Sequence, residues 1–380
     1  MGQLVRVLRV VPLVSASAKY GGPSDTAVAQ SRLVSDQTHK VTVAAGYLRG
    51  DRPMTMESSD SSCTFVLFPV RVMVPGTGFP SLGSPQAISS LFQEVGRADI
   101  VHVSFSREFL PVLTVALAKL RGKPTVLQPH GMLTARTSRL HRVLDLVIRP
   151  LFRGAKAVIA LTRHEKAALL AWSGNDMPEC FVVGNPRVNV LPSSPLGSAV
   201  KDDEALFLAR LEPRKHVTDF AEAALIAHNA GWGDQYKIVG PDQGDLQKIQ
   251  AVIDSCPNLS YEGPIPGLAV AARLQQCRVF VLPSFEEPWG NVLVLALSLG
   301  IPVVVARSAA LATDVETFGA GEVVDDGDAV GLARAVHRLL TEQSAYLSAR
   351  RGALLMSETM FDQQAIKSGL QSAYAYGQRV

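Results

Sequence analysis

The sequence has little of what marks several other classes of protein. Only four of its 380 residues are cysteines, and none are spaced as a Cys-x-x-Cys pair. The absence of such a pair argues against a zinc knuckle or a disulfide framework, and it favours a reducing, cytoplasmic compartment. No apolar stretch approaches the ~20 residues that span a bilayer. The net charge is +3, from 37 basic and 34 acidic residues, and is too small to indicate nucleic acid as a partner. No P-loop motif occurs, which disfavours a kinase or ATPase of that type.

Short apolar runs alternate with longer helical patterns along the whole chain. The run Ser24–Ser35 predicts the first helix, with Ser24 as its cap. Near-continuous apolar runs are typical of parallel strands that are buried on both faces, so the fold class is α/β with doubly wound sheets. The predicted strands of the first half are Leu4–Val11, Lys40–Ala45, Thr64–Val70, Asp99–Phe105, Pro124–Gln128, Ala157–Leu161 and Cys180–Val183. Those of the second half are Ala205–Leu211, Tyr236–Val239, Leu259–Tyr261, Val279–Leu282, Pro302–Ala306 and Glu322–Val324.

A stretch rich in proline and serine, Asn185–Lys201, separates the two series of strands. Its composition is typical of a linker. We therefore predict an N-terminal Rossmann-like domain over residues 1–185, a linker over 186–200 and a second Rossmann-like domain over 201–360. Ligands commonly bind between two such domains.

Two pairs of residues suit a bound nucleoside diphosphate. Gly21 and Gly22 lie between the first predicted strand and the first predicted helix, where glycines let the backbone approach a phosphate. Taken alone, a tight turn is the simpler interpretation of this pair. Arg210 and Lys215 lie between a strand and a helix, where fixed cations stabilise the growing charge of a departing diphosphate. The alternative is a pair of solvated surface cations.

Two glutamates follow another strand end. Glu286 and Glu287 come after the predicted strand Val279–Leu282 and before the predicted helix Asn291–Leu299. Acidic side chains at the carboxyl end of a strand, followed by a glycine turn and a helix start, can bind sugar hydroxyls and phosphate together. The alternative is an exposed acidic loop.

His130 follows the predicted strand Pro124–Gln128. A lone histidine is more often structural than catalytic, but the carboxyl end of a strand is where a side chain can reach the predicted cleft. We therefore include His130 among the candidate site residues.

The stretch Arg136–Lys156 carries six basic residues and one acid, Asp145. Its apolar residues form a stripe along one predicted helix. We interpret the stripe as the core-facing side of an amphipathic helix that is kinked near Pro150. The alternative is that the basic face contacts an anionic membrane surface. The stripe consists of Leu140, Val143, Leu144, Val147 and Ile148.

Taken in order, these motifs resemble those of the retaining glycosyltransferases of family 4 (group 1), which have the GT-B fold. The resemblance covers nearly the whole chain. It is carried by Tyr20–Pro23, Asp99–Val103, Pro129–Leu133, Arg210 with Lys215, Ile238–Gly240, Tyr261–Gly263 and Pro283–Val304. The resemblance implies two Rossmann-like doubly wound domains facing across a cleft, with a C-terminal helix over residues 361–380 that returns to the first domain. It also implies that neither a metal nor another cofactor is needed.

The resemblance implies roles for single residues as well. Arg210 and Lys215 would hold the diphosphate, Glu287 would contact the donor sugar, and His130 would lie beside that sugar; these four would be the catalytic residues. The nucleotide-sugar site would be completed by Gly21, Gly22, Ile265, Trp289, Gly290 and Asn291.

Two positions depart from the family pattern. Leu295 stands where the family usually has a second glutamate, which binds ribose hydroxyls. His216 stands where a glycine usually follows the phosphate-binding lysine. A leucine side chain cannot accept a hydrogen bond, so the ribose contact is lost or comes from another residue.

We therefore predict a hexosyltransferase-type enzyme that moves a sugar from a UDP- or GDP-sugar to a glycan, glycolipid or lipid-linked acceptor. It would act in the cytoplasm or on the inner face of the membrane, without nucleic acid as a partner. Two alternatives stay open at this point. One is a GT-B binding or scaffold protein that has lost transfer, which Leu295 favours. The other is a nucleotide-sugar epimerase, an isomerase with the same architecture.

Overall fold

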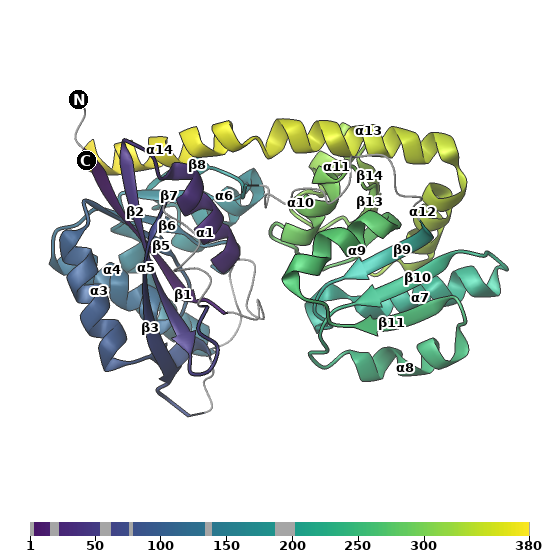
Figure 1. Ribbon diagram of the computed structural model, residues 1–380, viewed down its shortest axis with the longest axis horizontal. Helices are drawn as coiled ribbons and strands as arrows, with labels where there is room; N and C mark the ends of the chain where they lie inside the picture. Colours follow the sequence, from purple (N-terminus) through teal and green to yellow (C-terminus); the bar gives the residue numbers. More distant parts are fainter. Residues whose placement is uncertain are drawn as a thin grey trace. The chain divides into compact units, whose positions relative to one another are not determined.

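The computed structural model forms two compact units (Figure 1). It describes residues 4–15, 23–53, 62–75, 79–133, 139–186 and 202–379. Unit 1 combines Met1–Pro186 with Gln363–Val380, and unit 2 is Arg187–Asp362. Gly21, Gly22 and nearly all of the predicted linker lie outside the described residues. The predicted cleft between the domains stays a prediction.

Unit 1 is built on a sheet with the strand order β4-β3-β2-β1-β5-β6-β7-β8. Neighbouring strands are parallel, except that β4 runs antiparallel to β3. The short strand β4 was not predicted, because two residues carry no periodic pattern. The strands are β1 (Val5–Leu13), β2 (His39–Leu48), β3 (Thr64–Val72), β4 (Leu82–Gly83), β5 (Ile100–Ser104), β6 (Thr125–Gln128), β7 (Ala157–Ala160) and β8 (Glu179–Val182).

Helices cover both faces of this sheet, which explains why its strands are apolar on both sides. One face packs against α1 (Pro23–Val34) and α14 (Gln363–Arg379). The other face packs against α3 (Pro85–Arg97), α4 (Phe109–Leu120), α5 (Arg139–Arg153) and α6 (Arg163–Ser173), and a 3-10 turn, η1 (Phe79–Ser81), precedes β4. The C-terminal helix α14 thus completes unit 1, although the chain passes through unit 2 before reaching it.

Ser24 does not cap α1 as predicted. The helix already includes Pro23, and the Ser24 hydroxyl donates a hydrogen bond to the carbonyl oxygen of Leu13. Proline is well suited to the first helical position because it needs no backbone N–H there. The Ser24 side chain therefore ties the helix start to the end of β1 instead of satisfying the helix backbone.

The interpretation of the stripe on α5 was partly wrong. Ile148 is buried as predicted, but Val143 is 61% exposed and Val147 59%. Leu146, which the predicted stripe did not include, is 75% exposed. The reason is Asp145, which faces inward because its carboxylate accepts hydrogen bonds from the Arg107 guanidinium and the Trp172 indole. An inward Asp145 turns the neighbouring apolar side chains toward solvent.

Unit 2 is built on a parallel sheet with the order β11-β10-β9-β12-β13-β14. Its strands are β9 (Asp202–Leu208), β10 (Gln235–Val239), β11 (Leu259–Gly263), β12 (Cys277–Leu282), β13 (Val303–Ala306) and β14 (Gly321–Val324). From β9 the chain adds β10 and β11 on one side of the strand, and it then returns to add β12, β13 and β14 on the other side. The strand order therefore reverses between β9 and β12. Open α/β sheets bind ligands in the crevice at such a switch point.

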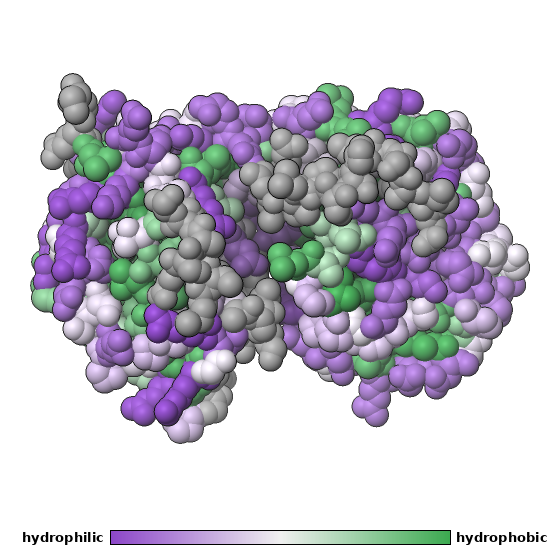
Figure 2. Space-filling view, in the orientation of Figure 1, coloured by the Kyte–Doolittle hydropathy of each residue, from purple (hydrophilic) through white to green (hydrophobic). Residues whose placement is uncertain are grey.

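The helices of unit 2 bury the faces of this sheet. One apolar core lies beneath α7 (Val217–Asn229), α8 (Leu246–Ser255) and α12 (Ala329–Thr341). The remaining helices are α9 (Val270–Gln276), α10 (Asn291–Ser298), α11 (Ala312–Phe318) and α13 (Gln343–Met360), with 3-10 turns η2 (Pro213–Lys215) and η3 (Gly267–Ala269). The visible surfaces of both units are largely hydrophilic, with small apolar patches (Figure 2). All four cysteines are buried and form no disulfide.

Candidate active site

Lys215 and Glu287 meet at the switch point of unit 2. Lys215 ends the turn η2 that follows β9, and Glu287 lies in the loop that follows the neighbouring strand β12. The Lys215 ammonium donates a hydrogen bond to Oε2 of Glu287. Both side chains are nearly buried, with exposed fractions of 11% and 6%. The structure thus joins two predicted site residues that are 72 positions apart in the sequence.

The surroundings of Glu287 keep its carboxylate ionised. Burial alone raises the pKa of this carboxyl group. The positive charges of Lys215 and Arg214 and the hydrogen bond from Lys215 outweigh burial, so the pKa of Glu287 lies below its ordinary value. Arg214, which follows a proline in the same loop, was not predicted as a site residue. Glu287 is therefore an ionised acceptor that can receive hydrogen bonds from hydroxyl groups.

The backbone of the loop decides which glutamate faces inward. The Phe285 N–H donates to the carbonyl oxygen of Arg214 at 2.9 Å, which ties this loop to the one that carries Lys215. Glu286 is exposed and has a φ of 46°, and its N–H donates to the Ser308 hydroxyl at 2.9 Å. A non-glycine residue in the left-handed region costs roughly 1–3 kcal/mol and persists only when its surroundings hold it there. The strained Glu286 allows Glu287 to point toward Lys215.

Gly290 forms the turn between this loop and α10. Its φ is 74°, and a side chain there would press against Leu293 at 3.1 Å and Leu282 at 3.3 Å. Asn291 begins α10 directly after it, and no side chain caps the helix start. The Trp289 side chain is buried against Phe361, with 5.7 Å between ring centroids. The Trp289 side chain is therefore part of the packed interior of unit 2.

Two other predicted residues of unit 2, Arg210 and Ile265, lie in the loops after β9 and β11. Arg210 is exposed and forms an ion pair with Glu212 at 3.1 Å. No interaction of the described residues joins Arg210 to Glu287. Ile265 is half-buried in the loop after β11, and β10 separates that strand from β9. Gly240 directly follows β10, and its lack of a side chain lets it approach the carbonyl oxygen of Ala209 beside Arg210.

His130 lies in unit 1, just after β6. Its side chain is buried and its φ is 53°. Its Nε2 atom lies 3.5 Å from Nη2 of Arg9 and 3.4 Å from the Ser104 hydroxyl. Burial and the charge of Arg9 hold the pKa of His130 well below its ordinary value. Arg9 was not predicted as a site residue, although an arginine inside an apolar strand is an unusual signal.

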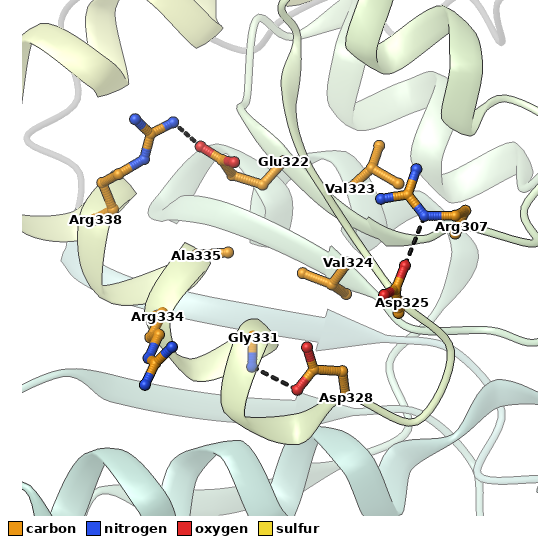
Figure 3. A pocket seen from close by; sticks show the side chains of 10 residues that line it. All are labelled: Arg307, Glu322, Val323, Val324, Asp325, Asp328, Gly331, Arg334, Ala335 and Arg338. Atoms are coloured by element: carbon orange, nitrogen blue, oxygen red, sulfur yellow. Dashed lines mark hydrogen bonds and ion pairs between the residues drawn. The ribbon is translucent and has the colours of Figure 1, made fainter.

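A hollow in the described part of unit 2 lies away from this pair. It has a volume of about 340 Å³ and lies between β14 and α12 (Figure 3). No predicted site residue lines it. Its charged side chains neutralise one another, because Arg307 pairs with Asp325 at 2.6 Å and Arg338 pairs with Glu322. The candidate residues are instead the Lys215–Glu287 pair within unit 2 and His130 within unit 1.

Comparison with known families matches both units. Residues 202–342 match "Glycosyl transferases group 1", and residues 21–186 match "Glycosyl transferase 4-like domain". The chain belongs to the group 1 glycosyltransferases. The first match contains both members of the Lys215–Glu287 pair, and the second contains His130.

Individual relatives share only a modest sequence identity with this chain. A GDP-mannose-dependent alpha-mannosyltransferase from Mycolicibacterium smegmatis is 33% identical over 150 residues, which are 39% of this chain and 38% of the relative. A D-inositol 3-phosphate glycosyltransferase from Pseudarthrobacter chlorophenolicus is 22% identical over 323 residues, which are 75% and 74% of the two chains. The aligned parts span only 38% and 37% of the length of the M. smegmatis relative and of a Salinispora tropica relative.

Solved structures match over almost the whole chain. The Anabaena protein Alr3699/HepE, in complex with UDP and glucose, has a TM-score of 0.76 and 18% identity, and the match covers 98% of this chain and 99% of that one. TarM from S. aureus has a TM-score of 0.76 and 10% identity, with 98% and 100% coverage. These likenesses establish the fold, which is the GT-B fold of glycosyltransferases.

Proposed function

We propose that this glycosyltransferase is a retaining enzyme that moves a sugar from a UDP- or GDP-sugar to a glycan, glycolipid or lipid-linked acceptor. The buried Lys215–Glu287 pair at the switch point of unit 2 is the observation that supports this proposal most. The relatives agree in kind, since one depends on GDP-mannose and one solved neighbour holds UDP and glucose.

Each group at this site has a chemical role in the proposal. Lys215 and the exposed Arg210 bind the diphosphate and stabilise the negative charge that grows as it leaves. Glu287 accepts hydrogen bonds from hydroxyls of the donor sugar, which suits the low pKa of its carboxyl group. Backbone N–H groups at the start of α10 add a partial positive charge close to the same place.

An acceptor-dependent assay tests the proposal. The protein is incubated with a panel of nucleotide sugars, first alone and then with candidate acceptors, and the free nucleoside diphosphate is measured. We expect release that requires the acceptor, and NMR of the product is expected to show the anomeric configuration of the donor. Donor binding without release would favour a scaffold, as the leucine at position 295 does. Isomerised nucleotide sugar without acceptor would favour an epimerase.

Transfer is expected to continue in the presence of EDTA. In the proposal, fixed cations take the place of a divalent ion at the leaving diphosphate. The described residues contain no group of three His, Cys, Asp or Glu side chains placed to hold a metal ion. The measurement is the initial rate with and without EDTA. Complete loss of activity that Mg²⁺ or Mn²⁺ restores would contradict the assigned roles of Lys215 and Arg210.

Replacing Leu295 with glutamate is expected to tighten donor binding by about tenfold to a hundredfold, because a hydrogen bond to a charged group contributes roughly 1.5–3 kcal/mol. Leu295 is half-buried and lies one helical turn after Asn291 on α10. A glutamate there can reach a ribose hydroxyl. Calorimetry with the cognate nucleotide sugar measures the change.

The Leu295→Glu variant has a matched control in Val292→Glu. Val292 is also half-buried on α10, so the control adds the same charge to the same helix at a different position. Equal affinities for Leu295→Glu and the unmodified protein would show that this helix does not contact the ribose.

We further propose that α5 contacts an anionic membrane surface, which suits a lipid-linked acceptor. Its exposed apolar residues Val143, Leu146 and Val147 follow the spacing i, i+3, i+4 and so share one side of the helix. Arg142 and Arg153 are exposed on the same helix and Arg149 is half-exposed. Apolar residues flanked by arginines are typical of helices that lie in a membrane interface. No helix in the described part of the chain is long and apolar enough to span a membrane.

Flotation with lipid vesicles tests this contact. We expect binding to vesicles that contain phosphatidylglycerol, weaker binding at high salt, and little binding to pure phosphatidylcholine. The double variant Leu146→Ser/Val147→Ser is expected to bind the vesicles at least about tenfold more weakly, because each apolar side chain that enters the membrane contributes about 1.5–3 kcal/mol to binding. Leu120→Ser is the control, because Leu120 is 77% exposed on a different helix, α4. Equal loss in both variants would contradict the assignment to α5.

A further inference from the structure

Arg9 is a buried cation in the middle of strand β1. It is 1% exposed, which is rare for an arginine. Among the described residues no carboxylate forms an ion pair with it, and its Nε and Nη1 atoms have no hydrogen-bond partner. Burial lowers the pKa of Arg9 to about 10, which still leaves it charged at neutral pH. Keeping an unpaired charge in the interior costs stability, so its position calls for a functional explanation.

Four polar atoms lie within 3.5 Å of the Nη2 atom of Arg9. Nη2 carries two N–H groups and can only donate, so it shares its hydrogen bonds among these neighbours. The distances are 3.0 Å to Oε1 of Gln128, 3.2 Å to Oγ of Ser104, 3.4 Å to Oε1 of Gln30 and 3.5 Å to Nε2 of His130. These groups come from β6, β5, α1 and the loop after β6, so four segments of unit 1 meet at one guanidinium group.

This arrangement favours one tautomer of His130. The Arg9 guanidinium presents only N–H groups, so an Nε2 atom that faces it with a lone pair avoids an unfavourable contact between two N–H groups, and the proton then lies on Nδ1. Nδ1 is buried and has no acceptor among the described residues. The imidazole therefore presents one unused N–H donor.

We propose that Arg9 is a positioning residue that holds the His130 imidazole in the form with its proton on Nδ1, so that this N–H donates a hydrogen bond to a substrate oxygen. The role in transfer rests on the proposed function. In this role His130 is a hydrogen-bond donor and not an acid or a base. Because the His130 imidazole does not change its protonation in the neutral pH range, its N–H donor is present throughout that range.

The other ionisable groups near His130 leave this arrangement intact. His102 on β5 is buried, and its Nδ1 lies 2.8 Å from the Tyr374 hydroxyl of α14. The pKa of His102 is also well below its ordinary value, through burial and the charge of Arg9, so it adds no positive charge. Glu165 on α6 accepts hydrogen bonds from the backbone N–H groups of Gly131 and Leu161 and thereby holds the loop beside His130.

Nitrogen NMR of the histidine side chains tests the proposal on the whole protein without any substrate. His130→Gln assigns the signals by their disappearance. In the unmodified protein we expect His130 to show a protonated Nδ1, an unprotonated Nε2 and no titration near the ordinary histidine pKa of about 6.5. A protonated Nε2, or titration near that value, would overturn the proposal whatever the protein's activity.

Two variants separate Arg9 from the remainder of the cluster. Arg9→Met removes the charge at similar length, and we expect His130 to populate the other tautomer or to titrate near the ordinary value. Ser104→Ala removes the second contact of Nε2 and is expected to leave the Nδ1–H form unchanged. If Arg9→Met does not fold, Arg9→Lys retains a donor and is expected to retain the Nδ1–H form. An unchanged His130 in folded Arg9→Met would overturn the role of Arg9.

Activity then tests the link to transfer separately. We expect Arg9→Met to lower kcat more than it raises KM and to make the rate depend on pH in the range where His130 now titrates. A protein with the expected NMR signature but no transfer with any donor would contradict the proposed function and leave the tautomer assignment in place.

Discussion

Replacing Lys215 with alanine is expected to reduce sugar transfer by at least about a hundredfold, because a fixed cation at the leaving group contributes ~2–4 kcal/mol to lowering the barrier. It is also expected to lower the free energy of unfolding by about 3–5 kcal/mol, the usual cost of breaking a buried ion pair. The reason is Glu287, whose buried carboxylate would be left without its ammonium partner. Steady-state kinetics and denaturant unfolding measure the two effects.

Two further variants separate the two roles of Lys215. The double variant Lys215→Met/Glu287→Gln removes both charges and is expected to regain most of the stability without regaining transfer. Arg210→Ala is expected to lose transfer while its stability changes by no more than about 1 kcal/mol, because Arg210 is exposed and pairs only with Glu212 among the described residues. Full activity in both Lys215→Ala and Arg210→Ala would show that these cations do not touch the diphosphate.

Replacing His130 with alanine is expected to reduce transfer by about a hundredfold to a thousandfold, as loss of one preorganised hydrogen-bond donor typically does. The protein is expected to fold, with a loss of stability of roughly 1–2 kcal/mol, because alanine is less tolerant than histidine of the left-handed backbone that the chain adopts here. The measurements are kcat/KM and thermal unfolding on the same preparation.

Asn175 provides the matched control for His130. Its φ is 63°, and it is exposed just after α6. Asn175→Ala therefore carries a comparable backbone cost at a residue to which no ligand contact is assigned. We expect it to lose some stability and no activity. A His130→Ala protein that unfolds, or one that keeps full activity, would assign His130 to the structure of unit 1 alone.

Much of the fold was predictable because its pattern is local. Every predicted strand overlaps a strand of the structure, since a parallel strand covered on both faces must be a short apolar run. The errors occur where local pattern and tertiary contacts conflict. On α5 the apolar stripe alone favoured burial of Val143 and Val147, but Asp145 takes the inward position through its contacts with Arg107 and Trp172.

The candidate site was predictable only in part. Strand ends, glycine turns and charged residues are visible in the sequence, and they led to Lys215, Glu287, Gly290 and His130. Which of the two adjacent glutamates faces the lysine depends on a strained backbone at Glu286 and on hydrogen bonds from loops far away in the sequence. No spacing rule contains that information.

The sequence by itself determined the alternating α/β architecture, the separation into two halves and the family to which the chain belongs. Only the tertiary structure decided which ionisable groups meet. Arg9 and His130 are 121 positions apart, and Lys215 and Glu287 are 72 apart. The first two come together because β5 lies between β1 and β6 in the sheet, and the second two because β9 and β12 are neighbours although other strands lie between them along the chain. Strand order is a property of the whole packed sheet, and the charge state of a buried group follows from its neighbours there.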